Sequence, residues 1–121
     1  MTSVLIVEDN ARNLKLVRDV LGHAGYETLE ASDAESGLAL AREQRPDLVL
    51  MDINLPGMTG IEALAHLRAD AGTAAIPVAA LTAYAMKDDR ARILAAGFDG
   101  YLEKPVDVRA LPAQVEALLK R

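Results

Sequence analysis

The chain has 121 residues, of which 51% are hydrophobic and 26% charged, a composition typical of one globular domain rather than a disordered chain. It contains no cysteine, which excludes disulfides, thiolate metal sites and cysteine nucleophiles. The formal net charge of -5 argues against binding nucleic acid through its phosphates, and no apolar stretch is long enough to span a bilayer. The first residues also lack a signal peptide. We therefore expect one domain over residues 1–121, in the cytoplasm, with no nucleic-acid or membrane partner.

Segments with the features of strands and helices alternate from the first residues onwards. Short apolar runs bounded by turn signals predict strands, and apolar side chains every three or four residues predict helices. In chain order the first elements are a strand within 3–10, a helix at 11–24 stopped by Gly25, a half-exposed strand at 26–32 and a helix at 33–44. The apolar faces of these helices contain Leu14, Val17, Leu21 and Ala24, then Ala34, Gly37, Leu38 and Ala41.

The same alternation continues to the end of the chain. The further elements are a strand at 48–52, a helix near 60–70, a strand at 76–82, a helix over about 86–96 and a strand at 100–104. A last helix carries Val108, Leu111, Val115 and Leu118 on one face. Pro112 follows the expected cap Asp107 by about five residues, where we expect it to remove one helical hydrogen bond and distort the first turn.

This order of elements predicts the fold class. Strands that each lead into a helix form a parallel sheet with helices on both faces. Five such units match the doubly wound, flavodoxin-like α/β/α fold with strand order 2-1-3-4-5. The second strand alternates like an edge strand, whereas the first, third and fourth are the most apolar, and both observations favour this order.

Asp52 ends the third apolar run and is followed by a turn that contains Pro56 and Gly57. By itself this pattern suits either a residue that opens a surface turn or a carboxylate at the mouth of a site. The expected topology favours the second reading, because strands 1 and 3 are neighbours whose carboxyl ends border the ligand crevice.

Three carboxylates then meet at this crevice. Glu8 and Asp9 follow the first strand, Asp52 ends the third, and adjacent strands lie about 5 Å apart. Carboxylates this close repel one another unless a cation lies between them, and an oxygen-only site suits Mg²⁺. The two histidines, His23 and His66, are expected on the surfaces of helices.

Two further polar residues end strands at the same edge. Thr82 ends the fourth predicted strand, and Lys104 ends the fifth, directly before Pro105. Each alone fits an ordinary role, the threonine as a cap and the lysine as a solvated charge. Together with the carboxylates they describe a phosphoryl-transfer site: a nucleophile, a metal, an ammonium that neutralises phosphate oxygens and a hydroxyl that hydrogen-bonds one of them.

At these residues the sequence resembles the receiver domain of two-component response regulators, over essentially the whole chain. The matching pieces are "LIVEDN", "DLVLMDINLPGMTG", "PVAALTAYA" and "YLEKP". Wider similarity, including "TAYAMK", indicates the single-domain cell-cycle regulators within the family. The resemblance implies a signalling protein, not an enzyme in the ordinary sense, that catalyses its own aspartyl phosphorylation and dephosphorylation.

The resemblance also implies a role for each matching residue. Asp52 would accept phosphate from a phosphohistidine, and Thr82 and Lys104 would bind the aspartyl phosphate. Tyr101 occupies the position of the aromatic residue that reorients on activation. The Lys104–Pro105 peptide bond is typically cis in the family.

For the metal, the resemblance implies that Asp9, Asp52 and the backbone carbonyl of Asn54 bind Mg²⁺. The pair Glu8–Asp9 replaces the commoner two aspartates, and the longer side chain of Glu8 would support the metal through water.

The expected partners are a histidine kinase or a histidine phosphotransfer protein upstream, and a protein downstream. A donor histidine must approach Asp52 in line, so its helix would contact the elements that flank the mouth. The docking residues expected there are Asn10, Arg12, Asn13 and Pro105. The downstream protein would read the face made by the helix at about 86–96, the strand at 100–104 and the last helix.

The expected switch starts at Thr82. If the Thr82 hydroxyl moves toward the phosphate, the loop at 83–86 follows it inward, and the vacated space lets Tyr101 rotate from exposed to packed. Without the resemblance, Tyr101 would be read as an ordinary residue of an edge strand.

Two other functions share parts of this pattern. A haloacid-dehalogenase-like phosphatase also uses a strand-end aspartate with Mg²⁺, but it needs an acid two residues later, where this chain has Asn54. A flavodoxin-like electron carrier would need a Ser/Thr/Gly-rich loop after the first strand, where this chain has "EDNARN". The chain ends at Arg121 after the last helix, which favours a free-standing domain, but "VEDN" followed by Asn13 also occurs in receivers of hybrid kinases, so a fragment stays open.

Overall fold

The computed structural model describes residues 2–83 and 87–120, which form a five-stranded parallel sheet with five helices. The strands are β1 Ser3–Val7, β2 Glu27–Ala31, β3 Leu48–Asp52, β4 Val78–Thr82 and β5 Gly100–Glu103. The helices are α1 Ala11–His23, α2 Ala34–Gln44, α3 Gly60–Ala69, α4 Lys87–Ala95 and α5 Leu111–Leu119. The strand order is β2-β1-β3-β4-β5, which confirms the predicted doubly wound topology.

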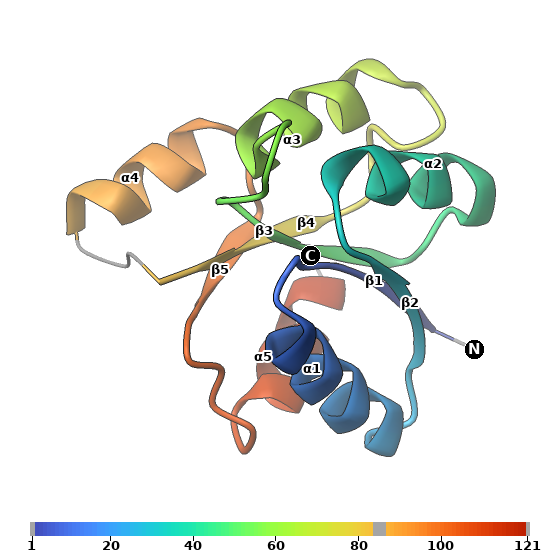
Figure 1. The fold of residues 1–121 in the computed structure, drawn as a ribbon, viewed down its shortest axis with the longest axis vertical. Helices are drawn as coiled ribbons and strands as arrows, with labels where there is room; N and C mark the ends of the chain where they lie inside the picture. Colours follow the sequence, from blue (N-terminus) through green and yellow to red (C-terminus); the bar gives the residue numbers. More distant parts are fainter. Residues whose placement is uncertain (1, 84–86, 121) are drawn as a thin grey trace.

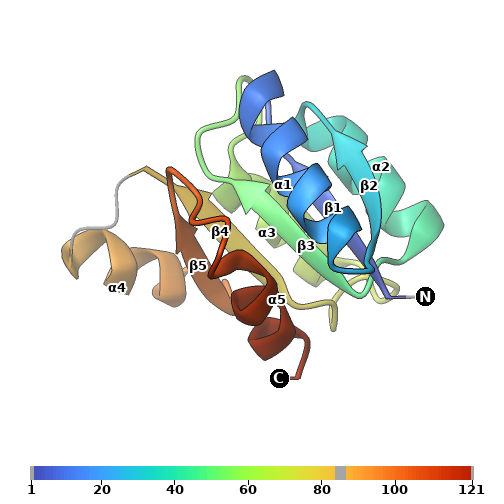
Figure 2. The same cartoon turned by 90° about the horizontal axis from the view of Figure 1, so that it is seen from below.

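The molecule has three layers, with the sheet between two groups of helices. Helices α2, α3 and α4 cover one face of the sheet, and α1 and α5 cover the other (Figures 1 and 2). Each face has its own apolar core, and the residues of a strand alternate between the two. In β3, for example, Val49 and Met51 belong to the core under α2 and α3, whereas Leu48 and Leu50 belong to the core under α1 and α5.

The burial of the strands explains their composition. All residues of β3 and β4 are buried, as expected of central parallel strands that are apolar on both faces. Strand β2 has exposed residues and lies at the edge, as its alternating sequence predicted. Within the described part of the chain, every helix is too short or too polar to cross a membrane.

Side chains cap the N-termini of α1, α2 and α3. Asn10 Oδ1 accepts the N–H groups of Arg12 and Asn13 at 3.0 and 3.1 Å at the start of α1. Asp33 Oδ1 caps α2 in the same way. Thr59 and Glu62 form a reciprocal capping box at the start of α3. These caps fix the entry of each helix directly after the loops that border the site.

The last helix differs from its prediction. Asp107 Oδ1 accepts the N–H groups of Arg109 and Ala110, which closes a separate turn, and α5 starts only at Leu111. Val108 therefore lies outside the helix and is 45% exposed. The Leu111 N–H binds the Asp107 carbonyl at 2.9 Å and the Gln114 N–H binds the Ala110 carbonyl at 3.0 Å, while Pro112 between them has no N–H to donate. The loss of one helical hydrogen bond at Pro112 agrees with the prediction, and it separates the turn at 108–110 from α5.

The first helix shows a smaller difference. Val17 and Leu21 are buried and Leu14 is partly buried, but Ala24 is the exposed C-cap residue. The apolar face of α1 thus ends one turn before the predicted limit. The four residues predicted for the buried face of α2 are all buried.

Gly60 gives a prediction that links the fold to the site. It is the first residue of α3, and its N–H binds the carbonyl of Ile53 at 3.0 Å. A Cβ added at Gly60 would press against the backbone oxygen of Asp52 and lie 2.9 Å from the Cα of Ile53. Because these are backbone atoms, Gly60→Ala should lower the free energy of unfolding by about 1–3 kcal/mol, as measured by urea denaturation.

Gly22→Ala is the matched control for this change. Gly22 also lies in a helix, but an added Cβ there meets no atom within 4 Å. Its unfolding free energy should stay equal or rise by up to about 1 kcal/mol, because alanine favours helix. If Gly60→Ala were as stable as Gly22→Ala, the close packing of α3 on the end of β3 would be refuted.

Candidate functional site

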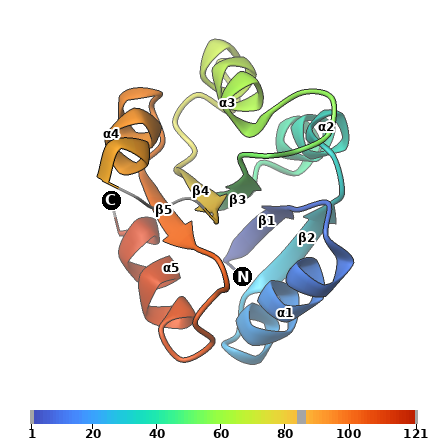
Figure 3. The same ribbon diagram turned by 60° about the vertical axis from the view of Figure 1, so that its left-hand side comes forward.

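The predicted carboxylates lie together at the carboxyl edge of the sheet. Asp52 ends β3, and Glu8 and Asp9 directly follow β1. Strands β1 and β3 are neighbours in the sheet (Figure 3). Each of the three offers a carboxylate oxygen, and these oxygens all lie within 4.8 Å of one another. Glu8 and Asp52 are buried, 1% and 4% exposed, whereas Asp9 is exposed. The cluster is therefore a pit with one wall open to solvent.

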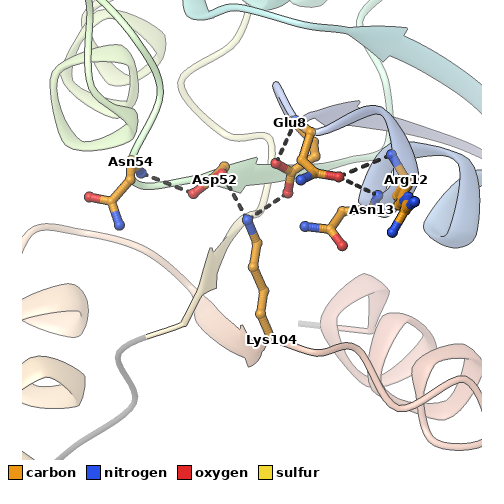
Figure 4. Close-up of polar contacts among 7 residues, drawn as sticks. Glu8, Arg12, Asn13, Asp52, Asn54 and Lys104 are labelled. Atoms are coloured by element: carbon orange, nitrogen blue, oxygen red, sulfur yellow. Dashed lines mark hydrogen bonds and ion pairs between the residues drawn. The ribbon is translucent and has the colours of Figure 1, made fainter.

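Lys104 joins this cluster from the end of β5. Its Nζ donates a hydrogen bond to Asp52 Oδ2 at 2.8 Å and forms an ion pair with Glu8 Oε2 at 2.7 Å (Figure 4). The backbone N–H of Lys104 binds the carbonyl of Thr82 at 2.8 Å, which holds the lysine beside the end of β4. The lysine is thus a part of the site and not the solvated charge that a lone strand-end lysine would suggest.

The other carboxylate oxygens bind backbone N–H groups of the loops that follow. Asp52 Oδ1 accepts the N–H of Asn54 at 2.9 Å (Figure 4). Glu8 Oε1 accepts the N–H of Asn10 at 3.1 Å. Both carboxylates are oriented by the chain two residues downstream, so their free lone pairs have defined directions.

Burial and charge oppose each other at this site. Burial raises the pKa of Glu8, and the ammonium of Lys104 offsets only part of that rise. Burial alone would lower the pKa of Lys104, but its bonds to Asp52 and Glu8 hold that pKa above its usual value. Lys104 therefore remains an ammonium over the neutral pH range.

The charges indicate what else the site can hold. Counted as ionised groups, the three carboxylates and the one ammonium sum to a formal charge of two negative units. Among the described residues, the buried Oε2 of Glu8 accepts no hydrogen bond beyond its ion pair with the lysine. An acidic, oxygen-only cluster with this charge and an open wall fits a hydrated divalent cation such as Mg²⁺.

Thr82 and Asn54 lie on the neighbouring side of the site. Thr82 is the last residue of β4 and only 2% exposed. It lines a small cavity of about 70 Å³ together with Asn54 and residues of α3 and α4. Thr82 therefore lies buried at the end of β4, beside the strand β3 that ends in Asp52.

Tyr101 lies outside this cluster, on β5. It pairs in register with Ala80, two residues before the end of β4, and its ring is partly buried against the core under α2, α3 and α4. The guanidinium of Arg90, from α4, lies over the ring at 5.6 Å from its centroid and binds Glu103 at 2.9 Å. The sequence patterns did not single out Arg90 or Glu103, because nothing in them gives the rotation of α4 about its axis.

The remaining predicted residues surround the mouth. Asn10 and Arg12 are exposed and Asn13 is partly buried, all at the start of α1. Pro105 is exposed, directly after Lys104, and the Lys104–Pro105 peptide bond is cis. His23 and His66 are exposed, as predicted.

The comparison with family models identifies the family of this chain. The model described as "Response regulator receiver domain" matches residues 4–116. This chain belongs to the response regulator receiver domain family. Among curated proteins, it is 49% identical to the polar-differentiation response regulator DivK of Brucella anthropi over 106 residues, which cover 88% of this chain and 86% of that protein. It is 48% identical to DivK of Brucella abortus over the same shares. These relatives confirm the resemblance to response regulators that was expected from the sequence.

Solved structures give the same result. The chemotaxis response regulator CheY4 of Vibrio cholerae superposes with a TM-score of 0.92 at 30% identity, over 98% of both chains. The receiver domain of a sensor histidine kinase from Pseudomonas aeruginosa PAO1 superposes with a TM-score of 0.90 at 32% identity, over 99% of this chain and 98% of that one. Its active site cleft contains a coordinated magnesium ion.

Family membership defines the general function. The chain is a phosphoacceptor domain of two-component signalling with an acidic site for Mg²⁺, and its partner class upstream is a histidine kinase. It is a signalling protein rather than a phosphatase or an electron carrier, so both alternative functions considered from the sequence are set aside.

Proposed function

We propose that Asp52 is the residue that accepts the phosphoryl group, from a phosphohistidine on a kinase or phosphotransfer protein. The observation that carries this proposal is the contact of Lys104 Nζ with both buried carboxylates, Asp52 and Glu8, at the open end of the sheet. A carboxylate oxygen of Asp52 attacks phosphorus and forms the O–P bond, while the P–N bond to the imidazole breaks and its electron pair returns to the imidazole nitrogen.

The residues around Asp52 stabilise the charge that develops on the phosphoryl oxygens. Lys104 already binds Asp52 Oδ2, so its ammonium is in place for an oxygen attached there. The Thr82 hydroxyl, buried at the end of the adjacent strand, would donate a hydrogen bond to a second oxygen. Lys104 acts without a large rearrangement, which lowers the cost of binding the transferred group.

The metal ligands in this proposal are Asp9, Asp52 and the backbone carbonyl of Asn54, with Glu8 acting through water. Support comes from the three oxygens within 4.8 Å of one another and from the two negative charges that Lys104 leaves uncompensated. When bound, Mg²⁺ neutralises phosphoryl oxygens and orients them for in-line transfer.

Asp9→Asn tests this ligand set. The exposed Asp9 forms the open wall of the pit, so its loss removes one charge without uncovering the core. We expect at least about a tenfold lower affinity for Mg²⁺ by titration calorimetry, because the site then offers the cation one negative charge fewer. Asp19→Asn, an exposed acid elsewhere on α1, is the control and should bind Mg²⁺ as the wild type does. Equal affinity in Asp9→Asn and wild type would remove Asp9 from the ligand set.

A transfer experiment tests the proposed source of the phosphate. The donor would dock on Asn10, Arg12, Asn13 and the loop at Pro105. Arg12→Glu should slow transfer from a radiolabelled phosphohistidine protein about tenfold, because docking loses a favourable charge and gains a repulsive one. Labelling by acetyl phosphate, which needs no docking surface, should stay unchanged. Equal slowing with both donors would show damage to the site and refute a docking role for Arg12.

The output of the switch in this proposal is the face made by α4, β5 and α5. Tyr101 and Gln114 line two cavities on this face, of about 320 and 430 Å³. Thr82 lies one strand away, so movement of its hydroxyl toward a phosphoryl group would be passed to β5 through the loop that follows β4. Residues 84–86 of that loop, which the sequence predicts to move inward, lie outside the described residues.

The remaining features of the proposal concern the cell. We propose a single receiver domain over residues 1–121 that works in the cytoplasm and controls a downstream protein of the cell cycle. The similarity to DivK proteins supports this assignment. A pull-down with phosphorylated protein against Asp52→Asn would identify that downstream protein.

A further inference from the structure

Arg90 connects α4 to β5 through two contacts at once. Its guanidinium Nη2 binds Glu103 Oε1 at 2.9 Å, and its Cζ lies 5.6 Å from the centre of the Tyr101 ring. Tyr101 and Glu103 are two residues apart on β5, so their side chains leave the same face of the strand, toward α4. The ion pair anchors the guanidinium in the position from which it covers the ring.

The ring is held between the core and this cation. On its inner side Tyr101 packs against the apolar core under α2, α3 and α4, and on its outer side it meets Arg90. A guanidinium within about 6 Å of an aromatic centre is attracted to the ring face. Arg90 and Glu103 are about half exposed, 47% and 55%, so a rotation that carries the ring deeper into the protein would move it away from the guanidinium.

The structure also shows how Asp52 is bound while Arg90 contacts the ring of Tyr101. Asp52 is engaged as a carboxylate by Lys104 Nζ at 2.8 Å and by the Asn54 N–H at 2.9 Å. In this structure the Arg90 contact with Tyr101 thus occurs together with an Asp52 carboxylate that Lys104 binds. A contact that favours one of two conformers shifts their ratio by its own differential free energy.

We propose that Arg90 and Glu103 form a latch that holds Tyr101 in its outer position until Asp52 is phosphorylated. This inference rests on the proposed switch at Tyr101 and adds its restraint: Arg90 acts as a positioning residue for the ring. Removing the latch should raise the ratio of packed to outer ring conformers in the unmodified protein about two- to fivefold.

Fluorine NMR of protein labelled with 3-fluorotyrosine tests the latch. The chain has three tyrosines, and Tyr101→Phe assigns the signal of Tyr101. The change of its shift between H₂O and D₂O reports how exposed the ring is. In Arg90→Ala without phosphodonor, we expect the Tyr101 signal to become less sensitive to the solvent, in the direction that acetyl phosphate with Mg²⁺ produces in the wild type.

The direction of the change in solvent sensitivity distinguishes a contact that restrains the ring from one that only shields it from water. If Arg90 only shields the ring, its removal makes the ring more exposed and the solvent sensitivity rises, which would overturn the proposal. Arg92→Ala is the matched control, because Arg92 is also an arginine of α4 in an ion pair, with Asp89, but has no contact with the ring among those the structure describes. An equal change in Arg92→Ala and Arg90→Ala would also overturn the latch.

Glu103→Gln completes the experiment. It removes the anchor of Arg90 while keeping the shape of the side chain, so its effect should have the same sign as that of Arg90→Ala. The double variant should change the ring no more than Arg90→Ala alone, since both belong to one contact. Additive effects would contradict a single latch. Failure of acetyl phosphate to modify Asp52 would count against the proposed function instead, because the comparison of unmodified variants does not depend on it.

Discussion

Asp52→Asn should abolish phosphorylation of this protein by acetyl phosphate in the presence of Mg²⁺. Asparagine has nearly the same shape as aspartate, but its amide is not a nucleophile and carries no charge for the cation. The mass of the intact protein should therefore gain one phosphoryl group in the wild type and none in the variant. This is the largest effect that we expect from a single substitution.

The variant should remain folded, so the loss can be assigned to chemistry. The amide oxygen can still accept the N–H of Asn54, and Lys104 keeps its ion pair with Glu8. Asp19→Asn, which changes an exposed carboxylate of α1, should be phosphorylated as the wild type is. A phosphorylated Asp52→Asn protein would show that the acceptor lies elsewhere.

Thr82→Ala should leave phosphorylation of Asp52 largely intact but remove most of the response of Tyr101. Thr82 is buried at the end of β4, and its hydroxyl is the donor that we expect to follow the phosphoryl group. Without this donor, the phosphate has no direct pull on the loop between β4 and α4. The measurement is the fluorine signal of Tyr101 with and without acetyl phosphate, together with phosphorylation-dependent pull-down of partners.

Thr82→Ser is the conservative partner of this experiment. Serine keeps the hydroxyl and loses one methyl group, so phosphorylation should again change the Tyr101 signal. If Thr82→Ala responded to phosphorylation as fully as wild type and Thr82→Ser, the switch would not pass through the hydroxyl of Thr82.

Most of the site could be predicted because its residues lie at strand ends. In a parallel sheet the carboxyl ends of all strands meet at one edge, so the order of strands alone brings together Glu8, Asp52 and Lys104. The alternating sequence of β2 and the apolar runs of β3 and β4 were enough to predict that order. The ion pairs of Lys104 add the detail that one ammonium serves both buried carboxylates.

Other features depend on geometry that a sequence pattern does not contain. Asp107 is a good capping residue, but it caps a separate turn, so the start of α5 and the exposure of Val108 were predicted wrongly. The position of Arg90 over Tyr101 depends on the rotation of α4 and on the length of the arginine side chain. The close approach of Gly60 to the backbone of Asp52 likewise depends on how α3 packs on the end of β3.

The most direct test of the account is to locate the phosphoryl group in the wild-type protein. The protein is incubated with acetyl phosphate, either with Mg²⁺ or with EDTA, and its peptides are mapped by mass spectrometry. We expect one modified residue, Asp52, in the sample with Mg²⁺ and almost no modification in the sample with EDTA, because the acidic cluster then lacks its cation. A phosphoryl group on another residue, or equal labelling of Asp52 without Mg²⁺, would contradict the proposed site.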